Sequence, residues 1–212
     1  MKYSFKQYQP LSLRLWHWLN ALTIFGLVAT VVLRKTFLSW RANSQIIQEK
    51  SNHVLDANVA NTIAKSLRDQ MWDWHYYLGF VLSFLLLWRI CVAVRNKNTS
   101  LKNQILTGVK EIPTLTGPSK FKASHYTLVK TAYALFYIVL LYMVLSGITL
   151  YFEDALKLSE TLEDGLQELH EAAAWFFYAF IVAHIAGVIA AEVRGDSGLI
   201  SDMFNGGNKS KE

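Results

Sequence analysis

The 212-residue chain combines 52% hydrophobic and 14% aromatic residues with only 17% charged residues and a net charge of +5. Its charges gather in connecting segments and leave long stretches without any, which excludes an ordinary soluble domain and predicts membrane spans of about 20 residues. The single cysteine, Cys91, excludes an internal disulfide, a four-cysteine iron–sulfur site and covalent haem attachment through C-x-x-C-H. No basic patch with interleaved aromatic residues lies outside the spans, so we expect no nucleic-acid partner.

Four apolar runs predict an all-α integral membrane protein with a four-transmembrane-helix bundle in the lipid bilayer. The spans are expected at residues 15–33, 74–94, 131–151 and 172–191, and we expect residues 1–212 to form a single membrane domain. The third span has no histidine in its apolar part, so we expect it to supply packing contacts rather than ligands. No cleavage site follows the first apolar run, which argues against a cleaved signal peptide.

A long connection, residues 34–72, separates the first two spans. Its apolar residues recur three or four positions apart, which predicts one or two amphipathic helices lying on the surface or against a partner. A loosely ordered loop is the alternative. The apolar residues with this spacing are Ile46, Ile47, Leu55, Val59, Ile63 and Leu67.

The charge of each connection predicts how the chain is oriented. Residues 95–124 carry a net charge of +5, whereas residues 152–166 carry a net charge of −4. Four spans place both termini on one side, and the positive-inside rule places them and residues 95–124 in the cytoplasm. The extracytoplasmic connection 34–72 has a net charge of +3, which goes against the rule, but the rule weakens for long connections.

Two histidines stand on one face of the fourth predicted helix. His170 precedes the apolar run from Ala172 to Ala191 and His184 lies within it, 14 residues further on. On an α-helix this separation is about 21 Å of rise and about 40° from a whole number of turns. Ionisable groups within a span are costly and suggest function. The spacing therefore predicts an imidazole near each membrane surface.

Histidines in two other spans match these two depths. His17 opens the first span on the cytoplasmic side, at the depth of His184, and His75 opens the second span on the outer side, at the depth of His170. Two neutral imidazoles from different helices are the axial ligands that a b-type haem requires. We therefore predict two non-covalent b-type haems, with the iron of one bound by His17 and His184 and the iron of the other by His75 and His170.

Other interpretations of the histidines fit the pattern less well. A zinc site would need three or four clustered ligands, and a proton relay would need carboxylates between the two levels, where the spans have none. His53 lies in a polar connection and is expected to be solvated. Gly79, one turn after His75, would let a macrocycle approach the backbone or would serve close helix packing. Arg89 either reaches the membrane interface or pairs with a haem propionate.

Four segments carry a family resemblance, and the last of them is the most specific. The chain resembles the b-type cytochrome subunits of membrane-bound nickel–iron hydrogenases and related bacterial four-helix di-haem cytochromes b. The likeness covers the four spans but not residues 34–72, and the third helix begins His-Tyr-Thr at His125 where the family has His-Asn-Pro. The matching segments are RLWHWLNALTI, WDWHYYLGF, SHYTLVKTAYALFYIVLLYMVLSG and HIAGVIAAEVRGDSGLISDMFNG.

The resemblance implies a multi-pass protein of the bacterial cytoplasmic (inner) membrane that is the electron-transfer subunit of an oxidoreductase complex. It would pass electrons between membrane quinone and an extracytoplasmic redox partner, either a hydrogenase iron–sulfur (small) subunit or a c-type cytochrome. Arg194, His125 and Tyr126 are candidates for quinone contacts near the cytoplasmic haem, and Arg194 is also a candidate for a propionate contact. The acidic segment 152–166 would suit a basic partner.

Two other functions stay open at this point, as does assembly into a homo-oligomer. The chain could be a self-sufficient superoxide:quinone oxidoreductase, although the long connection 34–72 resembles a docking surface instead. It could also be a non-redox membrane anchor whose histidines are incidental. An absorption spectrum distinguishes the two hypotheses that include haem from the hypothesis of a non-redox membrane anchor, because a protein without haem would show no α-band after reduction.

Overall fold

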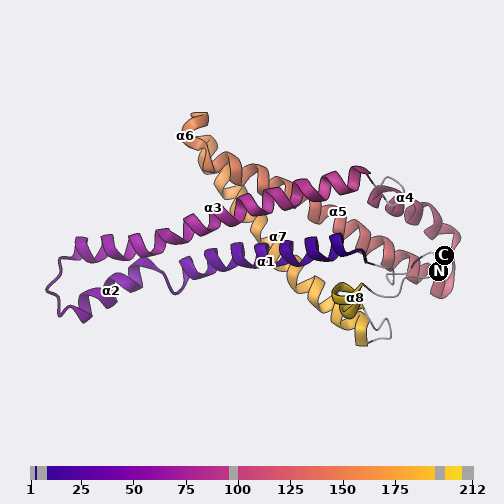
Figure 1. Ribbon diagram of the computed structural model, residues 1–212, viewed down its shortest axis with the longest axis horizontal. Helices are drawn as coiled ribbons and strands as arrows, with labels where there is room; N and C mark the ends of the chain where they lie inside the picture. Colours follow the sequence, from indigo (N-terminus) through magenta and orange to yellow (C-terminus); the bar gives the residue numbers. More distant parts are fainter. Residues whose placement is uncertain (1–2, 4–8, 96–99, 194–198, 207–212) are drawn as a thin grey trace. The chain divides into compact units, whose positions relative to one another are not determined.

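The computed structural model describes residues 3, 9–95, 100–193 and 199–206, and this part of the chain is helical without a strand (Figure 1). The all-α class predicted from the sequence is therefore confirmed. In chain order the elements are α1 (Leu11–Lys35), α2 (Trp40–Lys50), α3 (Ala57–Arg95), α4 (Leu101–Glu111), the 3-10 helix η2 (Ile112–Thr114), α5 (Gly117–Tyr151), α6 (Glu153–Leu156), α7 (Glu160–Val193) and α8 (Leu199–Asn205).

Four of the helices, α1, α3, α5 and α7, are long and apolar enough to cross a membrane. Each contains one of the four predicted spans. In the most apolar 18-residue stretch of each helix, only 6% to 28% of the residues are buried inside the protein. Each helix satisfies its own backbone hydrogen bonds, so it leaves no unpaired backbone group toward lipid. Its exposed apolar side chains are therefore suited to lipid contact. The structure thus has the four spanning helices that the sequence predicts.

The chain divides into two compact units, residues 18–85 and residues 1–17 together with 86–212. Each unit is described by itself. The first contains most of α1, all of α2 and most of α3. The second contains the start of α1, the end of α3 and all the later helices. The single membrane domain expected for residues 1–212 stays a prediction.

In the unit 18–85, the connection between the first two spans forms a helical hairpin of α2 and the start of α3. Ser44 Oγ donates a hydrogen bond to Asn61 Oδ1 at 2.6 Å. Ala60 and Ala64 are fully buried, and such small side chains allow close helix packing. This confirms the predicted helical connection, and the alternative of a loosely ordered loop is wrong.

One difference from the prediction is that the second half of this connection continues into the second span as a single helix. No glycine or proline interrupts residues 57–78, so nothing ends the helix before the span begins. The 39 residues of α3 correspond to about 58 Å of helix, whereas a bilayer with its headgroups is about 40–45 Å thick. The helix α3 is therefore longer than a bilayer is thick.

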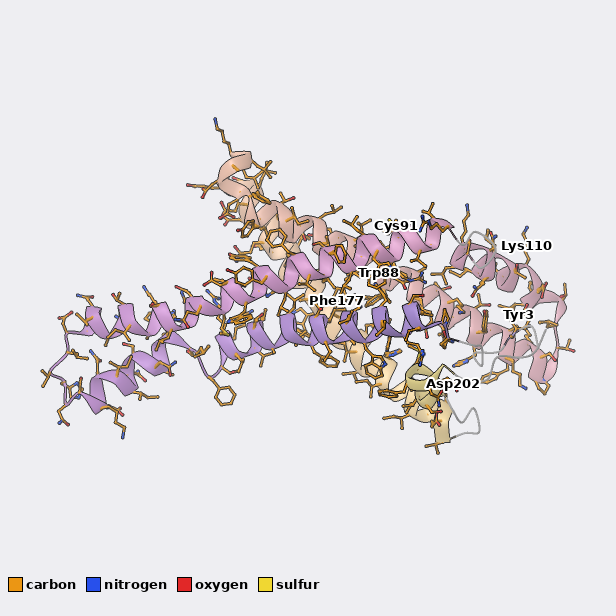
Figure 2. The ribbon with its side chains drawn as sticks, in the orientation of Figure 1. Tyr3, Trp88, Cys91, Lys110, Phe177 and Asp202 are labelled. Atoms are coloured by element: carbon orange, nitrogen blue, oxygen red, sulfur yellow. The ribbon has the colours of Figure 1, made fainter. Side chains whose placement is uncertain are left out.

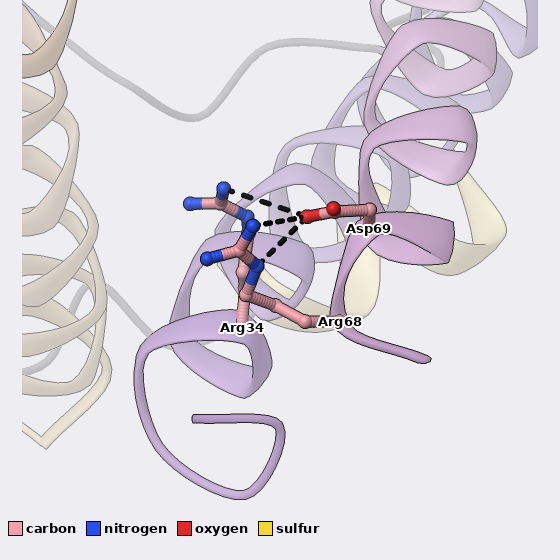
Figure 3. Close-up of polar contacts among 3 residues, drawn as sticks. All are labelled: Arg34, Arg68 and Asp69. Carbon is pink, nitrogen blue, oxygen red and sulfur yellow. Dashed lines mark hydrogen bonds and ion pairs between the residues drawn. The ribbon is translucent and has the colours of Figure 1, made fainter. Parts of the chain in front are cut away.

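An ionic cluster ties the end of α1 to α3 at the base of this hairpin (Figure 3). Asp69 Oδ1 lies 2.7 Å from Arg68 Nη2 and 3.8 Å from Arg34 Nη2. The Arg34 guanidinium also lies 4.3 Å from the centre of the Trp72 ring, a cation–π geometry. These contacts hold Trp72 in place one turn before His75.

In the other unit, α5 packs against α7, and α4 packs against the first part of α5. Phe177 of α7, which is labelled in Figure 2, is buried, and its ring centre lies 5.6 Å from that of Phe136 of α5. Gly108 of α4 approaches α5 so closely that an added Cβ would overlap with Thr127 Oγ1. A backbone hydrogen bond of 3.0 Å from Gln9 N to Gly206 O joins the residues just before α1 to the residue just after α8.

Candidate functional site

His17 of α1 and His184 of α7 lie together within one unit, and both side chains are half-buried. Their ring centres are 6.2 Å apart and their planes are tilted by 57°. With metal–nitrogen bonds of about 2.0–2.1 Å, two imidazoles on opposite sides of an iron have ring centres about 6.4 Å apart. The observed separation thus fits the pair of axial nitrogen ligands of a b-type haem.

Aromatic side chains of α7 and α5 adjoin the His184 ring of this pair. The Phe180 ring stacks on the His184 ring with an angle of 5° and a centre-to-centre distance of 5.9 Å. Phe180 also packs on Phe136 of α5, with ring centres 4.7 Å apart. Flat apolar rings next to the imidazoles suit a macrocycle that is held without covalent bonds.

Arg89 of α3 is held among aromatic side chains near His17. Its Nε donates a hydrogen bond of 3.1 Å to Tyr137 Oη. Its guanidinium carbon lies 5.6 Å from the ring centre of Trp16, the residue before His17. This fixed cation fits a partner such as a haem propionate, and that role of Arg89 stays a prediction.

The His170 ring on α7 is held by two adjacent residues of α5. Ser146 Oγ lies 2.7 Å from His170 Nδ1. An added Cβ at Gly147 would lie 3.3 Å from His170 Cε1, so the glycine makes room for the ring. The third span therefore supplies more than the general packing expected of it, because it sets the position of a predicted ligand.

The His75 ring on α3 has a corresponding contact with α1. Thr30 Oγ1 lies 2.9 Å from His75 Nδ1, and the Trp72 ring packs edge-on against the imidazole at 5.4 Å. An added Cβ at Gly26 would lie 2.8 Å from Leu78 Cδ1, so Gly26 lets α1 and α3 approach closely where Thr30 meets His75.

The contacts of Thr30 and Ser146 were not predicted from the sequence. A depth argument could have indicated Thr30, which lies 13 residues after His17 and therefore about 20 Å further along α1, at the level expected for His75. Ser146 has no comparable signal, because its contact depends on how α5 is rotated against α7. The two histidines, His75 and His170, belong to different units, and their pairing on one iron stays a prediction.

The remaining candidates have simpler surroundings. His53 is exposed between α2 and α3, as expected. His125 is exposed and stacks on Phe121 with ring centres 6.4 Å apart. A Cβ added at Gly79 meets no atom of the described residues within 4 Å, which does not support close helix packing there. Arg194 lies outside the described residues.

Clusters suited to other metals are not found in the described parts of the chain. No group of three or more His, Cys, Asp or Glu side chains there could hold a metal ion. Instead, the imidazoles of His17 and His184 form a pair. The rings of His75 and His170 each contact a hydroxyl group of a neighbouring helix. This donor set fits haem iron, which needs only two axial protein ligands.

Comparison with known proteins identifies the family of the chain. The model of the family "prokaryotic cytochrome b561" matches residues 8–206. No match was found among curated proteins or among solved structures. Proteins of this family bind b-type haem and transfer electrons, and the four apolar helices give the chain the multi-pass form that such a role requires. The chain belongs to the prokaryotic cytochrome b561 family and is a multi-pass membrane b-type cytochrome of electron transfer.

Proposed function

We propose that this cytochrome binds two haems and carries electrons across the bacterial inner membrane between an extracytoplasmic redox partner and the quinone pool. The observation that carries the proposal is the 6.2 Å separation of the His17 and His184 ring centres, which matches axial ligation of one iron. His75 and His170 are the ligands proposed for the second haem. We place both termini in the cytoplasm, which makes the His17–His184 haem the inner one.

The haem supplies one-electron chemistry when it is bound, and the protein sets its ligation, surroundings and position. Helix α7 contributes a ligand at both levels, because His170 and His184 are about 21 Å apart along it. Phe176 and Phe180 lie between them on α7 and stack with ring centres 5.9 Å apart. The helix thus fixes the distance between the haem levels and fills the space between them with apolar side chains.

Polar residues at the cytoplasmic end support a quinone site near the inner haem. Tyr126 Oη donates a hydrogen bond of 2.9 Å to Gln104 Oε1, and Lys130 Nζ lies 5.1 Å from the Tyr126 ring centre. Tyr126, His125 and Arg194 are the residues proposed for quinone contacts. On the outer side, the acidic segment 152–166 is proposed to receive a basic partner, either a c-type cytochrome or a hydrogenase small subunit.

Haem counting tests the proposed ligand pairs. The purified protein is expected to contain two haems per chain by the pyridine haemochrome assay. The His17→Ala variant should retain one haem, and adding His184→Ala should remove no more, because both ligands serve the same iron. Combining His17→Ala with His170→Ala should remove both haems. His53→Ala, at an exposed position, is the control and should retain both. One haem in the unaltered protein, or further loss in the His17→Ala/His184→Ala pair, would contradict the proposal.

A kinetic experiment tests the quinone end. Protein reduced with dithionite in liposomes is mixed with a soluble quinone, and the decay of the α-band is followed. The unaltered protein should be reoxidised completely. The His17→Ala variant should keep a reducible outer haem that the quinone oxidises much more slowly, because the inner haem on the path is missing. Equally fast reoxidation of this variant would place the quinone site elsewhere.

A further inference from the structure

Two buried hydroxyl groups lie against the histidines that we assign to the outer haem. Ser146 of α5 is 3% exposed and contacts His170 of α7, and Thr30 of α1 is 7% exposed and contacts His75 of α3. In both cases the hydroxyl contacts Nδ1 of the ring, at 2.7 and 2.9 Å respectively. The same arrangement therefore occurs twice, each time between a histidine and the neighbouring helix of its own unit.

The direction of the hydrogen bond at His170 follows from the second partner of Ser146. Ser146 Oγ donates to the backbone carbonyl of Tyr142 at 2.8 Å. A hydroxyl has one hydrogen, and a carbonyl can only accept, so the lone pairs of Oγ face His170. The Nδ1–H of His170 therefore donates to Ser146, and in the neutral ring the lone pair is on Nε2.

The same reasoning holds at His75. Thr30 Oγ1 donates to the backbone carbonyl of Leu27 at 2.7 Å, which uses its one hydrogen. The Nδ1–H of His75 therefore donates to Thr30, and in the neutral ring the lone pair is again on Nε2. Both rings thus carry a proton on the nitrogen that faces the protein, and in the neutral ring this leaves Nε2 as the nitrogen that can bind a metal.

We propose that Ser146 and Thr30 are positioning residues for the outer haem, which fix the Nδ1–H tautomer of His170 and His75 and present Nε2 of each ring to the iron. This inference rests on the proposed function, because it takes His75 and His170 as ligands of one haem. Metal-bound histidines generally donate their second ring N–H to an acceptor, which orients the ring and raises the basicity of the ligand.

Other hydroxyl groups on the same helices show that this contact is not a general property of serine and threonine in spans. Thr23 of α1 donates to the carbonyl of Leu19 at 2.8 Å, and Thr149 of α5 donates to that of Leu145 at 2.9 Å. Thr23 is also buried. Such bonds within a helix are common for these residues. Thr23 and Thr149 are therefore matched controls for Thr30 and Ser146.

Loss of either acceptor has a defined electronic effect. Because the acceptor increases the electron density of the imidazole, it favours the ferric iron and lowers the reduction potential. The Ser146→Ala and Thr30→Ala variants should each raise the midpoint potential of one haem, and it should be the same haem in both. Each should also accelerate transfer of that haem to apomyoglobin, by about tenfold or more.

The test combines redox titration, electron paramagnetic resonance of the ferric haems and haem transfer. Ser146→Thr and Thr30→Ser keep a hydroxyl and should restore the original potential and spectrum. Thr23→Ala and Thr149→Ala should change neither. The inference would be overturned if Ser146→Ala and Thr30→Ala behaved like these controls, or if the two variants altered different haems.

Failure of this inference can be distinguished from failure of the proposed function. If His170→Ala removes no haem, the ligand assignment is wrong and the hydroxyl groups have no haem to position. If His170→Ala removes one haem but Ser146→Ala leaves the potential and transfer rate of that haem unchanged, the ligand assignment stands and the positioning role alone is rejected.

Discussion

The imidazole rings of His17 and His184, from the first and last spanning helices, have their centres 6.2 Å apart. This separation fits two nitrogen ligands of one haem iron. The contact therefore brings α1 and α7 together at these two residues.

Replacing either member of this pair with methionine should change one haem only. Methionine–histidine ligation raises the reduction potential relative to bis-histidine ligation, so His17→Met and His184→Met should each raise the midpoint potential of the same haem. Redox titration followed at the α-band measures this. A shift in different haems for the two variants would show that the residues do not share an iron.

Arg89→Gln should lower the potential of the inner haem, because removing a nearby cation favours the ferric state. At an effective dielectric constant of 20, a unit charge about 10 Å from the iron contributes on the order of 1–2 kcal/mol, or roughly 40–90 mV. Tyr137→Phe removes the hydrogen-bond acceptor of Arg89 Nε but keeps the cation, so its effect should be smaller. Equal effects of the two variants in a redox titration would argue against a charge effect.

Gly147→Ala should weaken haem binding at His170. The new Cβ would lie 3.3 Å from His170 Cε1, so the ring must move by a few tenths of an ångström. Gly165→Ala on α7 is the control, because no described atom lies within 4 Å of its added Cβ. Alanine favours helix formation over glycine by about 0.8–1.0 kcal/mol at either position. Haem loss from the Gly147→Ala variant alone, measured by transfer to apomyoglobin, would therefore identify the ring contact as its cause.

The contact of Tyr3 with α4 should depend on pH in the alkaline range. Tyr3 Oη donates a hydrogen bond of 2.5 Å to Glu111 Oε2, and this bond raises the pKa of Tyr3 from 10.0 to about 12. The folded protein then holds a proton that the unfolded chain loses, so this contribution to stability is complete below pH 10 and is lost as the pH rises to 12.

Unfolding in detergent measures this contribution. The difference in unfolding free energy between the unaltered protein and Tyr3→Phe should decrease as the pH rises from 10 to 12. Lys110→Ala, a change beside Glu111 that leaves the tyrosine in place, should preserve the pH dependence of the unaltered protein. A difference that stays constant across this range would mean that the Tyr3–Glu111 bond adds no stability.

Neutralising the acidic segment should slow electron exchange with a basic c-type cytochrome. Asp154, Glu160 and Asp164 are exposed, and complementary charges mainly accelerate association. Stopped-flow mixing at low salt should show that the triple variant Asp154→Asn/Glu160→Gln/Asp164→Asn exchanges electrons with the cytochrome at a several-fold lower rate than the unaltered protein. The difference should vanish at high salt, because the charges are then screened. Glu49→Gln, on the hairpin, is the control for a general change in charge.

The sequence predicted the four spans because an apolar run of membrane length can form little other than a spanning helix. It also predicted that His17 and His184 would meet, since residue spacing on a helix determines depth in the membrane. The continuity of α3 was not predicted, because hydropathy marks where a span ends but not where its helix ends. The contacts of Ser146 and Thr30 depend on the rotation of one helix against another, which a single sequence does not determine.

The unbroken course of α3 gives the hairpin a mechanical connection to the second span. The same helix carries Asn61, which contacts α2 near the start of α3, and His75, which lies at the start of the predicted span. A helix without glycine or proline between these positions has no built-in hinge. A protein that binds the hairpin and tilts it would therefore also move the part of α3 that carries His75.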